Sequence, residues 1–386
     1  MRIVPYGERS CSNVERFHRR TAAASFRKVA AIPIPRGMLP LHRGTRIVET
    51  TVAVDEEIRE GNGRGRTRVT SSPHRLSLER IEQAARIIDP VFLHSPQFVC
   101  EPLGDELGVR LVLKIETLNP LRSFKGRGAD YCISQLPADA RLVCASAGNF
   151  GQAMAYACRK RGLALTVYAS VNANPFKVER MRALGANVVL HGEDFDAAKI
   201  EARRFASQSS ARMIEDSLDP ATGEGAGTIG LELLTFPEHI DTLLVPLGNG
   251  AMLAGIARVM KARSPGTRII AVQAAGAPAM VESWRAGRVI VHERMQTIAD
   301  GIGVRVPVPE ALADLRDLVD DALLVRDETI IRGMRLIHRH AGVVAEPSGA
   351  VGVAAMLEHP ALFRDRLVGT IVCGGNLTVE QMHEWL

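Results

Sequence analysis

This chain of 386 residues has no long apolar run. A helix that crosses a membrane needs about 18 or more consecutive apolar residues. The longest candidates, such as 142–147 and 343–345, are short and broken by polar residues or glycine. The sequence therefore predicts no membrane association, and we expect a cytoplasmic protein.

Cysteine is also scarce, and its six residues are scattered. They are Cys11, Cys100, Cys132, Cys144, Cys158 and Cys373. None forms the Cys-x-x-Cys pair that is typical of zinc sites, and the spacing does not indicate a disulfide framework. We expect reduced thiols, as in most cytosolic proteins.

Three further signatures are missing from the sequence. The body of the chain has no cluster of Lys and Arg of the kind that binds nucleic acid. Its glycine-rich turns lack the Lys-Ser/Thr of a nucleotide P-loop and do not follow the pattern Gly-x-Gly-x-x-Gly. These absences disfavour nucleic acid, ATP and NAD as ligands.

The positive charge of the chain lies mainly at its start. The net charge is +5, and residues 1–50 hold ten Arg or Lys against three Asp or Glu. We predict an Arg-rich N-terminal extension over 1–78, because no sustained helical period appears there. A disordered tail, a start codon assigned too far upstream and an organelle transit peptide are interpretations that the sequence leaves open.

From about residue 80 onward, short apolar runs alternate with amphipathic segments. The predicted strands include 110–115, 141–145, 165–169, 187–190, 241–245, 268–272 and 367–372. Strands that alternate with helices predict an α/β fold with twisted parallel sheets flanked by helices. The length favours two domains. We expect a large domain formed by 79–145 and 223–386, and a small domain formed by 146–222.

Three glycine-rich clusters, at 146–149, 248–250 and 374–376, each follow a predicted strand. Ligands bind at the carboxyl ends of the strands in such sheets, so the three loops could converge on one ligand. The second cluster leads directly into a predicted helix, whose first N–H groups and dipole suit a phosphate. Many α/β proteins use glycine in such turns without binding an anion, so this cluster alone does not establish a phosphate site.

Two side chains in these segments could carry chemistry. Lys125 lies between an aromatic residue and glycine, and a constrained, partly buried amine can form a Schiff base. The alternative is an ordinary solvated lysine, and spacing does not separate the two. Cys373 directly precedes the third glycine cluster. It is either inert core packing or a weak donor toward a ring nitrogen.

Five motifs occur in one order along the chain. They are Ser-Phe-Lys-Gly-Arg-Gly-Ala at 123–129, Ala-Ser-Ala-Gly-Asn at 145–149, Gly-Asn-Gly-Ala-Met at 248–252, Ala-Glu-Pro-Ser-Gly-Ala at 345–350 and Cys-Gly-Gly-Asn at 373–376. This ordered set resembles the fold-type-II pyridoxal-phosphate enzymes, which are tryptophan-synthase-β-like. The segments 227–232 and 297–301 resemble the threonine/serine dehydratase branch. The resemblance covers roughly 85–378.

The resemblance implies a role for each motif residue. Lys125 would bind the aldehyde carbon of pyridoxal 5'-phosphate and act as the catalytic residue, Asn149 would hydrogen-bond the ring hydroxyl, and Cys373 would face the pyridine nitrogen. The cofactor phosphate would be held by Gly248, Asn249, Gly250, Ala251 and Met252. The carboxylate of the substrate would be held by Ser146, Ala147, Gly148 and Asn149.

The resemblance also implies an activity. We expect α,β-elimination from a small L-amino acid such as serine or threonine, with release of a 2-oxo acid and ammonia, by a homodimer. Two alternatives stay open. One is a β-replacement synthase that makes a substituted alanine, and the other is an inactive binding protein on the same fold.

The sequence departs from the family pattern at several positions. Asn249 and Ala251 replace glycines of the phosphate loop, and Phe150 stands where relatives have histidine. Ala147 occupies the place of the serine that racemases use as a second proton donor. Cation-dependent relatives carry carboxylates in the segment that contains Gln273 and Ala279, so we expect no metal site.

Overall fold

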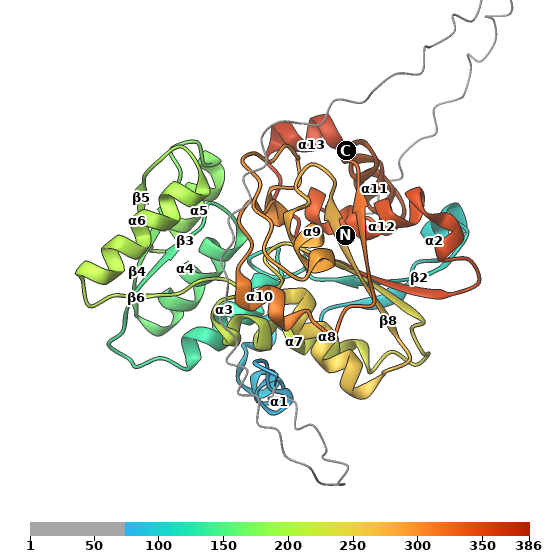
Figure 1. Ribbon diagram of the computed structural model, residues 1–386, viewed down its shortest axis with the longest axis horizontal. Coiled ribbons are helices and arrows are strands. Elements are labelled where there is room, and N and C mark those ends of the chain that lie inside the picture. Colours follow the sequence, from blue (N-terminus) through green and yellow to red (C-terminus); the bar gives the residue numbers. More distant parts are fainter. Residues whose placement is uncertain (1–73) are drawn as a thin grey trace, which may run out of the picture. The chain divides into compact units, whose positions relative to one another are not determined.

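A computed structural model describes residues 74–386 of the chain. Two sheets organise this part (Figure 1). The larger sheet has six strands, in the order β1 (Gln97–Val99), β2 (Arg110–Ile115), β10 (Leu367–Val372), β7 (Thr242–Pro246), β8 (Arg268–Ala274) and β9 (Asp321–Val325). Only β1 is antiparallel to its neighbour; the remaining pairs of this sheet are parallel.

The smaller sheet has four strands, and all its pairs are parallel. Their order is β5 (Asn187–Leu190), β4 (Ala164–Ala169), β3 (Arg141–Ala145) and β6 (Arg212–Met213). The sequence analysis assigned 141–145 to the large domain. In the structure β3 lies between β4 and β6 and pairs with β4 along its whole length, from Arg141 opposite Ala164. The smaller sheet therefore begins before the expected boundary.

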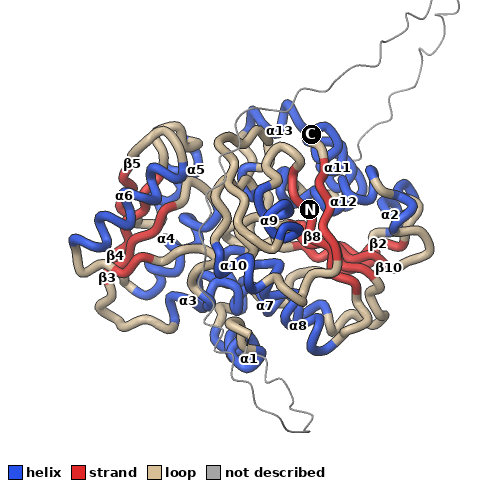
Figure 2. The backbone as a smooth tube through the Cα atoms, in the orientation of Figure 1, coloured by secondary structure: helices blue, strands red, loops and turns tan. Residues whose placement is uncertain are grey.

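Helices flank the strands, as Figure 2 shows in blue around red. The α-helices are α1 (Leu78–Ile87), α2 (Glu101–Leu107), α3 (Lys125–Ser134), α4 (Asn149–Arg161), α5 (Pro175–Ala183), α6 (Phe195–Gln208), α7 (Pro220–Leu233), α8 (Ala251–Arg263), α9 (Ala279–Ala286), α10 (Pro309–Asp314), α11 (Asp327–Ala341), α12 (Pro347–Glu358) and α13 (Val379–Trp385). Short 3₁₀ helices span Pro90–Phe92, Asp300–Ile302 and Pro360–Leu362. The arrangement confirms the predicted α/β fold with parallel sheets.

Glycine allows α7 and α8 to pack closely. A Cβ atom on Gly255 of α8 would lie 2.1 Å from the carbonyl oxygen of Gly223, which is in α7. A Cβ on Gly227 would lie 3.1 Å from the Gly255 carbonyl oxygen. Because backbone cannot move away as a flexible side chain can, a larger residue at Gly255 would separate the two helices.

The N-terminal end of the described region packs against the rest of the fold. Leu76 is buried, and the Ser77 hydroxyl accepts a hydrogen bond from the Arg80 N–H at the start of α1. Arg75 forms an ion pair with the buried Asp314 at 2.5 Å. Residues 74–78 are thus part of the folded structure, although we expected the extension to reach 78. The remainder of that expected extension lies outside the described residues.

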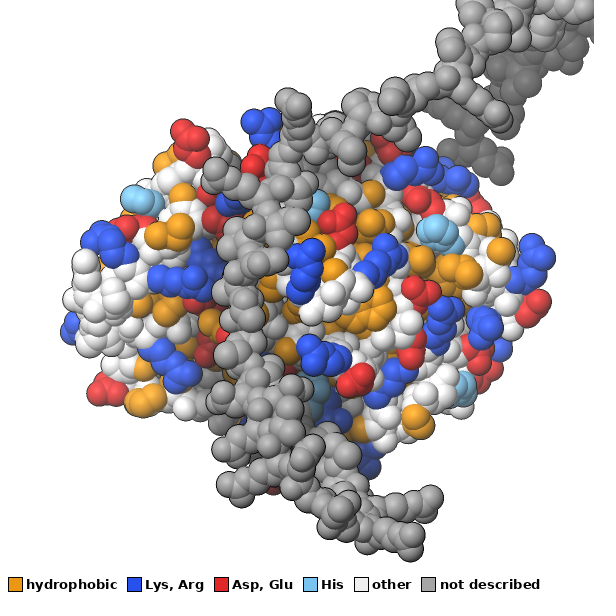
Figure 3. Space-filling view, in the orientation of Figure 1, with side chains coloured by type: hydrophobic (Ala, Val, Ile, Leu, Met, Phe, Trp, Pro, Cys, Tyr) orange, Lys and Arg blue, Asp and Glu red, His pale blue; other side chains and the backbone are white. Residues whose placement is uncertain are grey.

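Two observations on the described region concern nucleic-acid binding and membrane insertion, which the sequence did not favour. On the face drawn in Figure 3, Lys and Arg side chains are interspersed with Asp and Glu. No helix between residues 74 and 386 is long and apolar enough to cross a membrane.

Candidate active site

One cavity of about 340 Å³ gathers every site residue that the sequence analysis named. The eleven predicted site residues among those that line it are Lys125, Ser146, Ala147, Gly148, Asn149, Gly248, Asn249, Gly250, Ala251, Met252 and Cys373. They come from loops at the carboxyl ends of β3, β7 and β10 and from the start of α3. This convergence follows from parallel pairing, because the carboxyl ends of parallel strands meet at the same edge of a sheet.

Lys125 is the first residue of α3, and the loop before it is tied to the end of β10. The Phe124 N–H donates to the Cys373 carbonyl oxygen at 3.0 Å, and Ser123 forms a β-bridge with Gly374. The Lys125 Nζ lies 4.7 Å from the centre of the Phe124 ring and 2.5 Å from Asp216 Oδ2. The amine is therefore held inside the cavity by an aromatic ring and one carboxylate.

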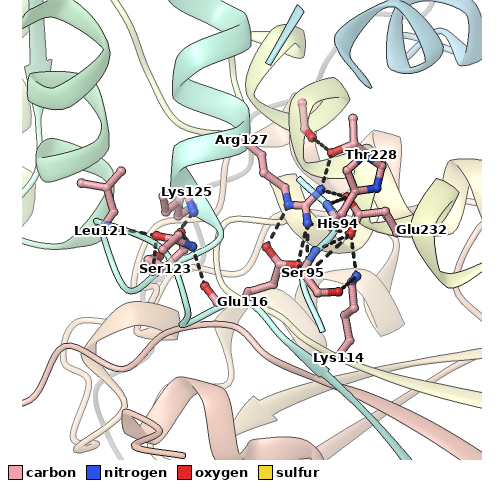
Figure 4. Close-up of polar contacts among 12 residues, drawn as sticks. His94, Ser95, Lys114, Glu116, Leu121, Ser123, Lys125, Arg127, Thr228 and Glu232 are labelled. Atoms are coloured by element: carbon pink, nitrogen blue, oxygen red, sulfur yellow. Dashed lines mark hydrogen bonds and ion pairs between the residues drawn. The ribbon is translucent and has the colours of Figure 1, made fainter. Parts of the chain in front are cut away.

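A buried ionic cluster supports the first turn of α3 (Figure 4). Its centre is the Arg127 guanidinium, which is completely buried and donates to Glu116 at 2.8 Å and to Glu232 at 2.6 Å. Lys114 Nζ lies 2.5 Å from Glu232 Oε2. Burial alone would raise the pKa of Glu232, but the hydrogen bonds and charges of Arg127 and Lys114 lower it to about 2. This Arg127 cluster fixes the helix turn that carries Lys125.

The turn between β7 and α8 has the form of an anion cradle. Gly250 has φ +100°, a left-handed conformation that a residue with a side chain rarely adopts. The next residue begins α8, where N–H groups lack partners within the helix and the helix dipole favours an anion. One of these groups, the Ala251 N–H, donates to the Ser217 hydroxyl at 3.1 Å.

Asn149 takes part in a buried network with Glu346 and Asn376. The Asn149 amide donates to Glu346 Oε1 at 2.7 Å, and the Asn376 amide donates to Asn149 Oδ1 at 2.8 Å. Burial raises the pKa of Glu346 to about 7, although the positive charge of Lys177 opposes the shift. Glu346 belongs to one of the quoted motifs, but the sequence analysis assigned it no role. Its carboxyl group titrates near neutral pH beside a predicted cofactor ligand.

Two further polar groups line the cavity. Burial raises the pKa of the Cys373 thiol well above its usual range, so the thiol stays neutral. The Ser348 hydroxyl is buried and has no hydrogen-bond partner among residues 74–386. A buried hydroxyl without a partner at the wall of a cavity suits a polar atom of a bound ligand.

The loop after β3 is shaped by its own serine. The Ser146 hydroxyl accepts hydrogen bonds from the N–H groups of Gly148 at 3.2 Å and Gly151 at 3.0 Å. A Cβ atom on Gly148 would meet no atom within 4 Å, so the space beside this loop is open. The Ala147 side chain is half-buried and supplies only a methyl group.

Two ion pairs at this cavity, Lys125–Asp216 and Lys177–Asp300, were not predicted from the sequence. Asp216 follows the two-residue strand β6, and no pattern singled it out. Lys177 of α5 is 6% exposed at its side chain, and its Nζ lies 2.5 Å from Asp300 Oδ2. Burial would lower the pKa of Lys177, but the charges of Asp300 and Glu346 together with the hydrogen bond to Asp300 raise it. Asp300 lies in the quoted segment 297–301. Among the residues of these two pairs that were not predicted, it is the one that a sequence motif could have placed near the site.

These residues fit pyridoxal phosphate. The cavity contains an amine, a helix N-terminus preceded by a left-handed glycine, a neutral thiol, an unpartnered hydroxyl and open space beside Gly148. The amine suits the aldehyde, the helix N-terminus suits the phosphate, and the neutral thiol suits the ring nitrogen of a phosphorylated pyridine aldehyde.

The segment that contains Gln273 and Ala279, where we expected no metal ligands, supports a helix. Gln273 Oε1 accepts a hydrogen bond from the Val281 N–H at 3.1 Å and thus supports α9, which Ala279 begins. Within residues 74–386 no group of three or more His, Cys, Asp or Glu side chains is placed to hold a metal ion. Independence from metals stays a prediction.

Comparison with known proteins agrees with this geometry. The family described as "Pyridoxal-phosphate dependent enzyme" matches residues 90–374. The L-threonine ammonia-lyase of Thermotoga maritima is 33% identical over 80% of this chain and 77% of its own length. The biosynthetic L-threonine dehydratase IlvA of Bacillus subtilis is 31% identical over 80% of this chain and 75% of its own.

Solved structures give the same fold. The processed form of threonine deaminase isoform 2 from Solanum lycopersicum has a TM-score of 0.73 at 29% identity and covers 80% of this chain and 93% of its own. Maize serine racemase has a TM-score of 0.76 at 29% identity and covers 80% of this chain and 96% of its own. The matches confirm the predicted fold, cofactor and lyase branch, and the chain belongs to the family of pyridoxal-phosphate dependent enzymes.

Proposed function

We propose that this enzyme eliminates the β-substituent of a small L-amino acid such as serine or threonine, giving a 2-oxo acid and ammonia. The observation that carries the proposal is the position of the Lys125 amine, which shares one cavity with all the predicted cofactor and substrate ligands. The named activities of the relatives from Thermotoga maritima and Bacillus subtilis support the same reaction class.

The residues divide the work between holding the cofactor and moving protons. Pyridoxal phosphate, when bound, supplies the electron sink that makes the Cα proton removable. Lys125 would hold the cofactor covalently, and its amine, when free, would remove that proton. The start of α8 would bind the phosphate, and Asn149 would bind the ring hydroxyl. The neutral Cys373 thiol would be the ligand of the ring nitrogen and adds no charge.

The loop after β3 would bind and orient the substrate. Ser146, Gly148 and Asn149 provide the polar groups for the substrate carboxylate. Racemisation requires an acid–base group on the side of the substrate opposite Lys125, and we place the methyl group of Ala147 there. Because a methyl group neither gives nor takes a proton, this site favours elimination over the racemisation named for the maize neighbour.

The test is a product analysis of the cofactor-loaded enzyme. L-serine and L-threonine are supplied separately, and 2-oxo acid, ammonia and D-amino acid are followed with time. We expect 2-oxo acid and ammonia in equal amounts. D-amino acid that forms faster than 2-oxo acid would overturn the proposal. So would a substituted alanine that replaces the 2-oxo acid when a thiol is added, or an enzyme that binds the cofactor and turns over neither substrate.

The assembly and location of the enzyme are also proposals. The family resemblance supports a homodimer in the cytoplasm that acts on a small amino acid. Sedimentation of the loaded protein would show twice the mass of the 41.9 kDa chain if the dimer forms.

A further inference from the structure

Asp216 lines this cavity but belongs to none of the quoted motifs. Its Oδ2 atom lies 2.5 Å from the Lys125 Nζ, and the two side chains are 14% and 17% exposed. The Lys125 amine makes no other hydrogen bond to residues 74–386. The carboxylate therefore touches the nitrogen that the proposed chemistry uses, and it lines the same cavity.

The other carboxyl groups of the cavity already have partners. Asp300 is paired with Lys177 at 2.5 Å. Glu346 accepts hydrogen bonds from the Asn149 amide at 2.7 Å and from the Asn376 N–H at 3.1 Å. Among the cavity residues that the structure describes, Asp216 is thus the carboxylate in contact with Lys125.

The backbone on both sides of Asp216 is anchored. The Glu215 N–H donates to Asp219 Oδ2 at 2.9 Å, and the Ser217 N–H donates to Thr222 Oγ1 at 3.2 Å. Ser217 has φ +69° and its hydroxyl accepts the Ala251 N–H. A residue that needs a left-handed backbone and is held from two sides fixes the direction of its neighbour. The position of Asp216 is therefore built into the loop.

We propose that Asp216 is a second catalytic residue, which carries the proton from Lys125 to the leaving oxygen of the substrate. The inference rests on the proposed elimination. A direct nitrogen–oxygen contact lets a proton pass without an intervening water. The leaving oxygen is two bonds from the carbon that Lys125 deprotonates, so a carboxylate that touches Nζ is close to both.

The steps balance without a further reactant. The Cα–H bond breaks, its proton goes to Lys125 Nζ, and its electron pair forms the Cα–Cβ double bond. Nζ passes a proton to Asp216 Oδ2, and Asp216 gives it to the β-oxygen. The Cβ–O bond breaks with its electron pair on oxygen, and water leaves. The amine and the carboxylate return to their starting forms.

The test uses leaving groups that differ in their need for a proton. Hydroxide leaves L-serine only with a proton, whereas chloride leaves β-chloro-L-alanine without one. Positioned acid–base groups contribute about 10²–10⁴-fold to rate. We expect D216N to lower kcat on L-serine by about 10²-fold or more, and kcat on β-chloro-L-alanine by about threefold or less.

Matched variants complete the experiment. D320N removes the carboxylate of another lysine–aspartate pair, Lys261–Asp320 at 2.6 Å, which does not line the cavity, and it should leave both rates unchanged. D216E keeps a carboxyl group and should recover L-serine turnover at least about tenfold above D216N. Turnover of β-chloro-L-alanine shows in each case that the variant is folded and loaded.

Two results of the variant assay would overturn the role of Asp216. One is an equal loss on both substrates, which would make Asp216 a group that only orients Lys125. The other is no loss on either. If D216N is insoluble, the wild-type enzyme decides: a solvent deuterium effect on kcat should appear with L-serine and be absent with β-chloro-L-alanine, and equal effects would contradict the proposal. Wild-type enzyme that binds the cofactor but turns over neither substrate would instead refute the proposed function.

Discussion

The Arg127 cluster and the cavity both contain buried charges, yet their polar groups are satisfied to different degrees. In the cluster, Arg127 and Lys114 are matched by Glu116 and Glu232, and the pKa of Glu232 falls to about 2. In the cavity, the Ser348 hydroxyl has no partner among the described residues, and the pKa of Glu346 rises to about 7. Satisfied ion pairs hold a fold together. A carboxyl group whose pKa is raised toward neutral pH and a buried hydroxyl without a partner are instead typical of reactive sites.

Substitution of Lys125 should cause the largest loss of activity with only a small loss of stability. The variant Lys125→Ala loses the group proposed to hold the cofactor and to remove the proton, so kcat/KM should fall by about 10⁴-fold or more. The free energy of unfolding should change by less than the loss of about 3–5 kcal/mol expected when a fully buried pair is broken, because Lys125 forms one ion pair and lines a cavity. Turnover assays and urea denaturation measure the two quantities. Substantial turnover with covalently attached cofactor would contradict the assignment.

The opposite result is expected for Arg127. Arg127→Met leaves Glu116 and Glu232 without their buried partner, and such a loss destabilises proteins by about 3–5 kcal/mol. Arg268→Met is the matched control, because its pair with Asp321 is 40% and 38% exposed and is worth about 1 kcal/mol or less. Urea denaturation compares the two variants. Equal losses would mean that the cluster does not stabilise the fold as its burial indicates.

The raised pKa of Glu346 should make the stability of the protein depend on pH. A carboxyl group whose pKa is raised to about 7 in the folded protein binds its proton more tightly there than in the unfolded chain. Its contribution to stability is therefore present at low pH and is lost as the pH rises from about 4.5 to about 7. Glu346→Gln removes this loss, so the variant should gain stability relative to wild type by more than about 1 kcal/mol between pH 4.5 and pH 8.

The measurement for Glu346 is urea denaturation of both proteins at several pH values. A constant difference in unfolding free energy across this range would show that Glu346 does not titrate there. The pH profile of kcat should also lose an inflection near 7 in the variant, because the Asn149 contact then no longer changes with pH.

A substitution at Gly250 should have the smallest effect of the variants considered, and it tests whether the turn before α8 binds the cofactor phosphate. Gly250→Ala forces a side chain into φ +100°, which should destabilise the protein by about 1 kcal/mol and weaken binding of the cofactor. A Cβ atom there would meet its nearest neighbour at 3.7 Å, so the effect comes from the backbone. Gly287→Ala, at φ +65° after α9 and outside the cavity, is the control. It should lower stability similarly without changing cofactor affinity, and equal weakening of cofactor binding by both would argue against the cradle.

Local sequence patterns predicted the fold and the convergence of the glycine-rich loops. They did not predict contacts between residues that are far apart in the sequence. Strand and helix alternation, with glycine at strand ends, predicted that three loops could converge on one ligand. The roles of the individual residues came from the family resemblance. The assignment of β3 to the smaller sheet depends on its pairing with β4, which no local pattern encodes. The Lys125–Asp216 contact joins residues 91 positions apart, and Asp216 follows a strand of only two residues. Such contacts depend on tertiary packing rather than on periodicity.

The most direct measurement asks which lysine carries the cofactor. Lys125 and Lys177 both line the cavity, and each lies 2.5 Å from an aspartate. Of the two, Lys125 is the lysine within a quoted motif. The loaded enzyme is reduced with borohydride, which fixes the cofactor to its lysine, then digested and mapped by mass spectrometry. We expect pyridoxal phosphate on Lys125 alone. Modification of Lys177, or of no lysine in an enzyme that absorbs near about 410–430 nm, would contradict the account.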